Sequence, residues 1–241
     1  MVGCYWSVCP RPQGVSPRVV GVNTPIVIIG AGGFGREVLD IITDANLIGG
    51  AADRGFDFLG FIDDGQPPAD RLDRLGVRHL GGMDALAGLP DGTVYAIGVG
   101  TGSVRRALDA RATAAGLRAA TLVHSQATIG ADVELGEGAV VCAGVRITTN
   151  IRVGRHVHLN LNSTVGHEAV LHDYVTVNPL AAVSGDVTIG EASTVGTTAC
   201  INQGITIGAG VMIASGSAVT SDVPDSVLVA GVPAKVKKQL N

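Results

Sequence analysis

The chain has 241 residues, which is enough for one large domain or two small ones. Charged residues make up 16% and aromatic residues only 3%, so we expect a core of Val, Ile and Leu. The net charge of −4 argues against a nucleic-acid partner, because nucleic-acid-binding proteins normally carry a basic face. No apolar run reaches the ~18 residues of a membrane span, so no membrane partner is expected either.

Residues 1–24 precede the first regular pattern and lack the apolar stretch and cleavage site of a signal peptide. We expect a poorly ordered extension on a cytoplasmic protein. Cys4 and Cys9 lie in this extension, whereas Cys142 and Cys200 lie far downstream. A lone CxxxxC spacing is weak support for a metal site or a disulfide, so reduced thiols are expected.

The first half of the chain alternates short apolar runs with segments of helical spacing. The predicted strands are 25–30, 56–64 and 93–100, and the predicted helices are 34–47 and 103–116. Such alternation is typical of an α/β unit with a parallel sheet. We therefore predict a Rossmann-like α/β domain over residues 25–120.

From Val123 to Val219 a branched aliphatic residue stands at every sixth position, seventeen in all without a slip. The next position is Gly or Asn in ten of these hexads, which suits tight corners where φ is positive. Neither a helix nor a hairpin meander repeats at six, whereas a β-solenoid does. Each buried aliphatic side chain contributes roughly 1.5–3 kcal/mol. The pattern predicts a self-supporting solenoid domain over residues 121–241.

This array resembles the hexapeptide-repeat acyltransferases, whose repeats form a left-handed parallel β-helix of triangular section. The resemblance implies three hexads in each coil, and it alone implies the left hand, since the usual chirality rule favours right-handed crossovers. The segments "VGHEAVLHDYV", "AAVSGDVTIG" and "VLVAGVPAKVKK" resemble the sugar O/N-acyltransferases of the NeuD- and PglD-like type. "GAGGFGREV", "GFIDD", "AIGVG" and "TLVHSQATIG" extend the match to about residues 25–237. The family implies a nucleotide-sugar acceptor, an acetyl-CoA donor and a homotrimer.

An adjacent imidazole and carboxylate, His167 and Glu168, interrupt the repeat at a corner where side chains project outward. With three hexads per coil, Thr149 lies one coil before His167 and Gly185 one coil after it. We expect His167 to take a proton from the nucleophile and the Gly185 amide to stabilise the oxyanion. Glu168 is expected to fix the imidazole tautomer and raise its basicity. The resemblance likewise implies His167 as the general base.

The acyl-CoA site is implied by the resemblance alone. Relatives often carry a second His nine residues after the catalytic one, in contact with the acyl donor, and this chain has Thr176 there. Thr197 and Ser215 are expected along the pantetheine path, at one hexad position in successive coils. Lys235, with its neighbours Lys237 and Lys238, is expected to face the nucleotide phosphates of CoA.

The acceptor site is expected at the GxGxxG motif of residues 30–35, between a strand and a helix. The acids ending the second strand come about 30 positions later, not the ~20 of a dinucleotide site, and the domain is half-sized. Backbone amides at the helix start are expected to meet ligand oxygens, while the acids and the third strand contact the nucleoside. The residues concerned are Gly32, Gly33, Phe34, Asp63, Asp64 and Gly98. Alternatively, the glycines only permit close packing of strand and helix.

The leading hypothesis is an acyltransferase that modifies an amino or hydroxyl group of a nucleotide-activated sugar without a metal. A zinc hydratase of the γ-carbonic-anhydrase type is an alternative, with His167 and His172 as two ligands. Such a site needs three protein ligands, and Ala131 and Gly136, two coils earlier, cannot coordinate. His156 and His158 fall in other columns. A non-catalytic sugar-binding solenoid is the third hypothesis.

Overall fold

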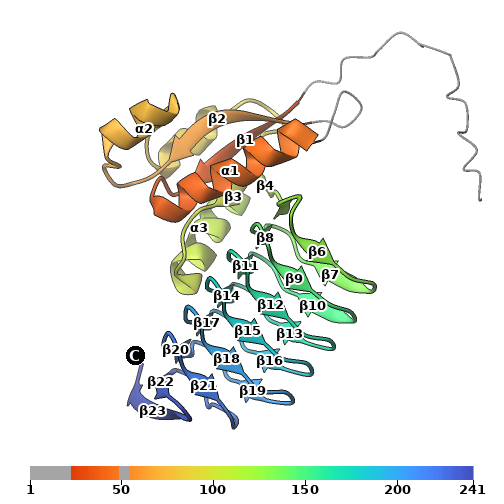
Figure 1. Cartoon of the computed structure of the whole chain (residues 1–241). Helices are drawn as coiled ribbons and strands as arrows, with labels where there is room; N and C mark the ends of the chain where they lie inside the picture. Colours follow the sequence, from red (N-terminus) through yellow and green to blue (C-terminus); the bar gives the residue numbers. More distant parts are fainter. Residues whose placement is uncertain (1–22, 49–54, 241) are drawn as a thin grey trace, which may run out of the picture.

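The computed structural model describes residues 23–48 and 55–240 (Figure 1). The predicted extension lies outside these ranges, together with Cys4 and Cys9, apart from its last two residues. Cys142 and Cys200 are free thiols. No helix in the described ranges is long and apolar enough to cross a membrane.

The N-terminal part is a four-stranded parallel sheet in the order β2–β1–β3–β4. Its strands are β1 (Thr24–Ile29), β2 (Phe56–Ile62), β3 (Val94–Ile97) and β4 (Arg118–Ala119). Its helices are α1 (Gly33–Ile48), α2 (Ala69–Leu75), the 3₁₀ helix η2 (Met83–Gly88) and α3 (Gly102–Ala114). The three predicted strands and two predicted helices are confirmed. The sequence pattern did not reveal α2, η2 or β4, which are short.

Both faces of this sheet are buried, as in parallel sheets generally. Ile26 and Ile28 point to the α1 face and share a core with Val38, whereas Val27 and Ile29 point to the opposite face, against η2 and α3. The core on the α1 face is continuous with the interior of the second domain. The two domains therefore pack together through a shared apolar layer.

The second part is a left-handed parallel β-helix with three faces, which confirms the predicted fold class. Face 1 consists of β5 (Leu122–Val123), β8 (Val140–Val141), β11 (His158–Leu159), β14 (Thr176–Val177), β17 (Thr194–Val195), β20 (Met212–Ile213), β22 (Val227–Gly231) and the antiparallel β23 (Ala234–Gln239). Face 2 consists of β6 (Thr128–Ile129), β9 (Arg146–Ile147), β12 (Thr164–Val165), β15 (Ala182–Val183), β18 (Cys200–Ile201) and β21 (Ala218–Val219). Face 3 consists of β7 (Val133–Leu135), β10 (Ile151–Val153), β13 (Val170–Leu171), β16 (Thr188–Ile189) and β19 (Thr206–Ile207). Each coil visits faces 1, 2 and 3 in turn, so the prism has a 1–2, a 2–3 and a 3–1 vertex.

The coil length is three hexads through most of the prism, as the register shows. Leu159, for example, pairs with Val177, and Val165 pairs with Val183. The last coil is slightly shorter than three hexads, because Ile213 pairs with Val229, and the β22–β23 hairpin follows. The predicted aliphatic column is buried from the second coil onward, whereas Ile129 in the first coil is 40% exposed.

The glycines at the second hexad position have a different role from the predicted one. Positive φ occurs at the fourth position of the hexads, as at Asn150, Asn162 and Gly204, and not at the second. A Cβ on Gly166 would instead lie 2.5 Å from the nitrogen of Gly185 in the next coil. The second-position glycines therefore permit close stacking of successive coils.

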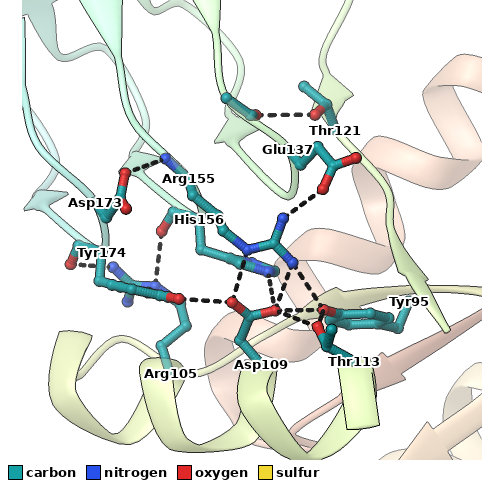
Figure 2. Close-up of polar contacts among 11 residues, drawn as sticks. Tyr95, Arg105, Asp109, Thr113, Thr121, Glu137, Arg155, His156, Asp173 and Tyr174 are labelled. Atoms are coloured by element: carbon teal, nitrogen blue, oxygen red, sulfur yellow. Dashed lines mark hydrogen bonds and ion pairs between the residues drawn. The ribbon is translucent and has the colours of Figure 1, made fainter. Parts of the chain in front are cut away.

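The helix α3 runs along the β-helix beside β11 and β14 (Figure 1). Its Arg105 is fully buried and donates hydrogen bonds across the domain junction to the carbonyl oxygens of His156 (2.9 Å) and Tyr174 (2.6 Å) (Figure 2). It also donates to the carbonyl oxygens of Val99, Gly100 and Val175. Arg105 thus bonds five main-chain carbonyls from three separate segments.

One turn later on α3, Asp109 accepts hydrogen bonds from both domains (Figure 2). The donors are Arg155 (Nε and Nη2, both 2.7 Å), Tyr174 (Oη, 2.6 Å), Tyr95 and, more weakly, Thr113 (Oγ1, 3.4 Å). Although burial raises the pKa of Asp109, these hydrogen bonds hold it well below its usual range. We call Asp109, Arg155, His156, Tyr95 and Tyr174 the junction cluster.

Candidate functional site

His167 and Glu168 form a contact pair at the 2–3 vertex, in the corner between β12 and β13. Glu168 Oε2 pairs with Nδ1 of the His167 ring, so Nε2 is the ring nitrogen left for other partners. The side chains are 52% and 49% exposed, respectively. An imidazole held through Nδ1 with Nε2 open to solvent has the arrangement of a general base.

The second oxygen of Glu168 has a partner that sequence reasoning missed. Asn150 Nδ2 donates a hydrogen bond to Glu168 Oε1 at 2.9 Å. This bond first, and His167 second, lower the pKa of Glu168 and keep it a carboxylate. The signal was present, because Asn150 stands three hexads before Glu168 and so in the same column.

Gly185 lies directly against the His167 ring. A Cβ at this position would be 2.4 Å from Cε1 of His167, so any side chain here would displace the imidazole from its present position. We expected the absence of a side chain at Gly185 to expose its amide. It also leaves the space that the His167 ring occupies. The Gly185 N–H donates no hydrogen bond within the described chain. A base nitrogen and an unpaired amide therefore lie side by side.

The residues predicted along the acyl-donor path occupy a different vertex from His167. Thr197 and Ser215 follow β17 and β20, so both lie exposed at the 1–2 vertex, in one column. Lys235 is exposed on β23, where it pairs with Ala230 in the terminal hairpin. One protomer does not bring these residues together with His167.

Thr176, predicted to contact the acyl donor, is only 2% exposed. Its hydroxyl donates to the carbonyl oxygen of Gly100 at 2.9 Å and accepts from Arg105 at 3.0 Å. The N-terminal domain covers face 1 at this point, so the side chain belongs to the domain junction. Its burial argues against the predicted contact.

The glycines of the GxGxxG motif divide into two groups. A Cβ on Gly35 would lie 1.9 Å from the carbonyl oxygen of Gly30, and one on Gly98 would lie 2.3 Å from the Gly35 Cα. These three glycines serve close packing, as the alternative hypothesis held. Gly32 has no atom within 4 Å of such a Cβ, and for Gly33 the nearest is 4.0 Å away. Of the motif glycines, Gly32 and Gly33 are thus the two that face open space.

The start of α1 leaves backbone donors without partners. The amides of Gly32, Gly33 and Phe34 donate no hydrogen bond within the described chain. The Phe34 ring packs against His158 of the β-helix, with centroids 4.9 Å apart. These amides therefore lie close to the junction with the β-helix.

The two acids after β2 are already bonded to the protein. Asp63 accepts from the amides of Ala31 and Gly65, both at 2.8 Å, which ties it to the glycine motif. Asp64 accepts from the Met83 amide and from Arg111, and these bonds lower its pKa. The structure thus brings the glycine motif and Asp63 together, with remaining acceptor capacity on each carboxylate.

Within residues 23–48 and 55–240, no group of three or more His, Cys, Asp or Glu side chains is placed to hold a metal ion. His167 and His172, the ligands of the hydratase alternative, lie at the 2–3 and 3–1 vertices, respectively. The geometry therefore separates them.

Comparison with known proteins identifies the family. The family described as PglD N-terminal domain matches residues 25–111. The acetyltransferase domain of PglB from Neisseria gonorrhoeae FA1090 is 30% identical with a TM-score of 0.79, covering 89% of this chain and 100% of that one. PerB from Caulobacter crescentus, solved with CoA and GDP-perosamine, is 30% identical with a TM-score of 0.79, covering 91% and 99%.

WeeI from Acinetobacter baumannii AYE is 30% identical with a TM-score of 0.76, covering 88% of this chain and 99% of that one. Among curated protein sequences, none matches the chain. The similarity therefore extends over nearly the whole length of three solved structures. The chain belongs to the hexapeptide-repeat sugar acyltransferases of the NeuD/PglD-like family, and it is an acyltransferase.

Proposed function

We propose that the protein transfers an acetyl group from acetyl-CoA to an amino or hydroxyl group of a nucleotide-activated sugar. The observation that carries this proposal is the His167 ring, held through Nδ1 by Glu168 and seated against Gly185 with its unpaired amide. The relatives support the choice of substrates: a PglB structure contains acetyl-CoA, and PerB structures contain CoA and GDP-perosamine.

In the proposed reaction, Nε2 of His167 removes a proton as the sugar amine or hydroxyl attacks the thioester carbonyl. The carbonyl oxygen becomes an oxyanion, which the Gly185 N–H stabilises. The tetrahedral intermediate then collapses, the carbon–sulfur bond breaks, and the proton held by His167 passes to the CoA thiolate. Glu168 keeps the proton of the neutral ring on Nδ1 throughout.

The donor site is proposed to lie between protomers of a homotrimer. Thr197 and Ser215 lie at the 1–2 vertex, whereas His167 lies at the 2–3 vertex. Packing the 1–2 vertex of one copy against the 2–3 vertex of the next would unite them in one groove. Lys235 would then meet the CoA phosphates as a cation. We place this reaction in the cytoplasm.

The acceptor is proposed to bind where α1 begins. The free amides of Gly32, Gly33 and Phe34 would hold phosphate oxygens, as helix N-termini do. Asp63, Asp64 and the backbone of Gly98 would contact the nucleoside.

The proposal is tested by replacing the base. His167→Ala should lower the rate of acetyl-CoA consumption, measured by thiol release with a panel of nucleotide sugars, by roughly 10²–10⁴-fold. CoA affinity, measured by calorimetry, should stay near normal. His172→Ala is the matched control, because it removes an exposed imidazole from another vertex. Full activity of His167→Ala would remove this residue from the mechanism. Bound zinc together with CO₂ hydration activity in the wild-type protein would favour the hydratase alternative.

A further inference from the structure

We propose that Asn150 is a positioning residue for the acyl transfer, one that aims the carboxylate of Glu168 at His167. The inference rests on the proposed function, since it concerns the same base. The supporting observation is that the two oxygens of Glu168 have different partners. Oε1 accepts a hydrogen bond from Asn150 Nδ2 at 2.9 Å, while Oε2 pairs with His167 Nδ1. A carboxylate held at both oxygens has a fixed plane.

The backbone explains why these two side chains meet. Asn150 and Glu168 occupy the fourth hexad position of successive coils at the 2–3 vertex, and each has a φ of 57°. The Asn150 N–H donates to the Ala131 carbonyl oxygen at 3.1 Å, and the Glu168 N–H donates to the Thr149 carbonyl oxygen at 3.2 Å. The corners are thus stacked and fixed, and Asn tolerates the left-handed region better than most residues.

The amide orientation is determined by its surroundings. Turning the Asn150 amide over would place Oδ1 against Glu168 Oε1, two acceptors without a proton between them. In the observed orientation Oδ1 lies 3.2 Å from the Thr149 hydroxyl, which is also 2.8 Å from the Ala131 carbonyl oxygen. Because the single Thr149 proton is shared with the shorter contact to Ala131, the orientation of the Asn150 amide is fixed mainly by Glu168.

The surroundings of Glu168 make this support necessary. The side chain is half exposed, so packing alone does not fix its rotamer. Other titratable groups in its column are Asp186 one coil later and Asp132 two coils earlier, the latter paired with Arg152. Neither carboxylate can donate a hydrogen bond to Glu168, whereas Asn150 can.

Two substitutions separate positioning from folding. Asn150→Ala removes the donor, and Asn150→Asp keeps the shape but sets a second carboxylate against Glu168. We expect kcat to fall roughly 5- to 50-fold, more for Asp than for Ala, with KM values for both substrates within about twofold. Asp132→Ala is the matched control: it has the same hexad position and a φ of 52°, but it lies two coils away from Glu168. Ala192, with a φ of 57°, shows that alanine fits such corners.

The pH profile gives a readout that a structural role would not change. Because Asn150 lowers the pKa of Glu168, its loss should make Glu168 protonate at higher pH. The acid limb of kcat/KM should therefore move to higher pH in both variants, and not in Asp132→Ala. Combined with Glu168→Ala, Asn150→Ala should lower kcat by less than about twofold more, since its only target is gone.

A second readout is independent of catalysis. In ¹⁵N-histidine-labelled protein, NMR should show the His167 ring mainly protonated on Nδ1 in the wild type, and a larger Nε2-protonated fraction in Asn150→Ala. If no nucleotide sugar is acylated, the proposed function fails, yet this tautomer shift still supports the positioning role. Wild-type tautomer and pH profile in Asn150→Asp, or an undiminished effect of Asn150→Ala beside Glu168→Ala, would overturn it.

Discussion

Two of the imidazole–carboxylate pairs in the chain, His156–Asp109 and His167–Glu168, lie in opposite environments. In the junction cluster, His156 Nε2 lies 3.0 Å from Asp109 Oδ1, with the two side chains 0% and 5% exposed. At the 2–3 vertex, His167 and Glu168 are about half exposed. Asp109 also accepts hydrogen bonds from Arg155, Tyr95 and Tyr174, whereas the side-chain partners of Glu168 among the described residues are His167 and Asn150.

The difference shows that a histidine next to a carboxylate is not sufficient for a general base, because the exposure of the ring also matters. Burial, outweighing the attraction of Asp109, lowers the pKa of His156 to about 4, so its ring is neutral. Neither of its ring nitrogens makes a hydrogen bond of good geometry, and no substrate can reach them. The His156 pair therefore belongs to domain packing, whereas the exposed His167 pair is available for the proposed chemistry. Variants at each should affect different measurements.

The largest effect is expected at the domain junction. Arg105→Met removes a donor from five carbonyl oxygens in a buried interface, and should lower the free energy of unfolding by about 3–5 kcal/mol. Among the described residues, the carbonyl oxygens of Val99, His156 and Tyr174 have no other donor, whereas Gly100 keeps Thr176 and Val175 keeps the His158 N–H. Urea unfolding measures this. Arg106→Met is the control, because its ion pair with Glu191 is exposed and should contribute less than ~1 kcal/mol. Equal free energies of unfolding for the two variants would contradict the role of Arg105 in holding the domain junction.

The next largest effect is expected on turnover at the vertex. Gly185→Ala places a methyl group where the His167 ring now lies, so the imidazole must move. A displacement of about 1 Å should lower kcat by roughly 10²-fold. Thermal unfolding should change little, because the ring can swing into solvent. A variant with wild-type kcat would show that the contact between Gly185 and the ring has no bearing on catalysis.

A smaller effect should appear in the pH dependence of stability. The pKa values of His156 and His158 are lowered by burial, so each takes up a proton only on unfolding. The free energy of unfolding should therefore fall as pH drops from about 6.5 toward 4, by up to ~1.4 kcal/mol per unit for each residue.

Urea titrations at several pH values would measure this slope. His156→Phe should reduce it, and an aromatic ring is tolerated at that corner, as Tyr174 shows at the same hexad position with a φ of 60°. The exposed His172→Phe is the matched control. A slope unchanged by His156→Phe would mean that this ring titrates alike in the folded and unfolded chain.

Periodicity made the β-helix predictable from sequence, because a six-residue rhythm of aliphatics leaves few other folds. It also placed Gly185 next to His167, since three hexads separate them. The same spacing of three hexads places Asn150 next to Glu168, so the contact with Asn150 could have been predicted from the sequence.

The domain junction was not predictable in this way. Arg105 and Asp109 sit in an ordinary helical pattern, and Arg155 lies 46 residues beyond Asp109. No local rule joins an α3 side chain to a corner of another domain. For the same reason Thr176 looked like a ligand contact, although the other domain covers it. The residues with positive φ were predicted at the wrong hexad position, because most second-position glycines are present for close stacking of the coils and not for positive φ.

The constant register has a consequence for how such a chain can change in length. One residue inserted between Glu168 and Ser184 would carry Gly185 out of line with the imidazole, although no local sequence around either is altered. A whole extra coil inserted between Val219 and the terminal hairpin would lengthen the prism, yet it would leave the His167–Glu168 corner and the contacts of α3 undisturbed. The domain can therefore gain whole coils at the end away from the N-terminal domain without moving Gly185 relative to His167.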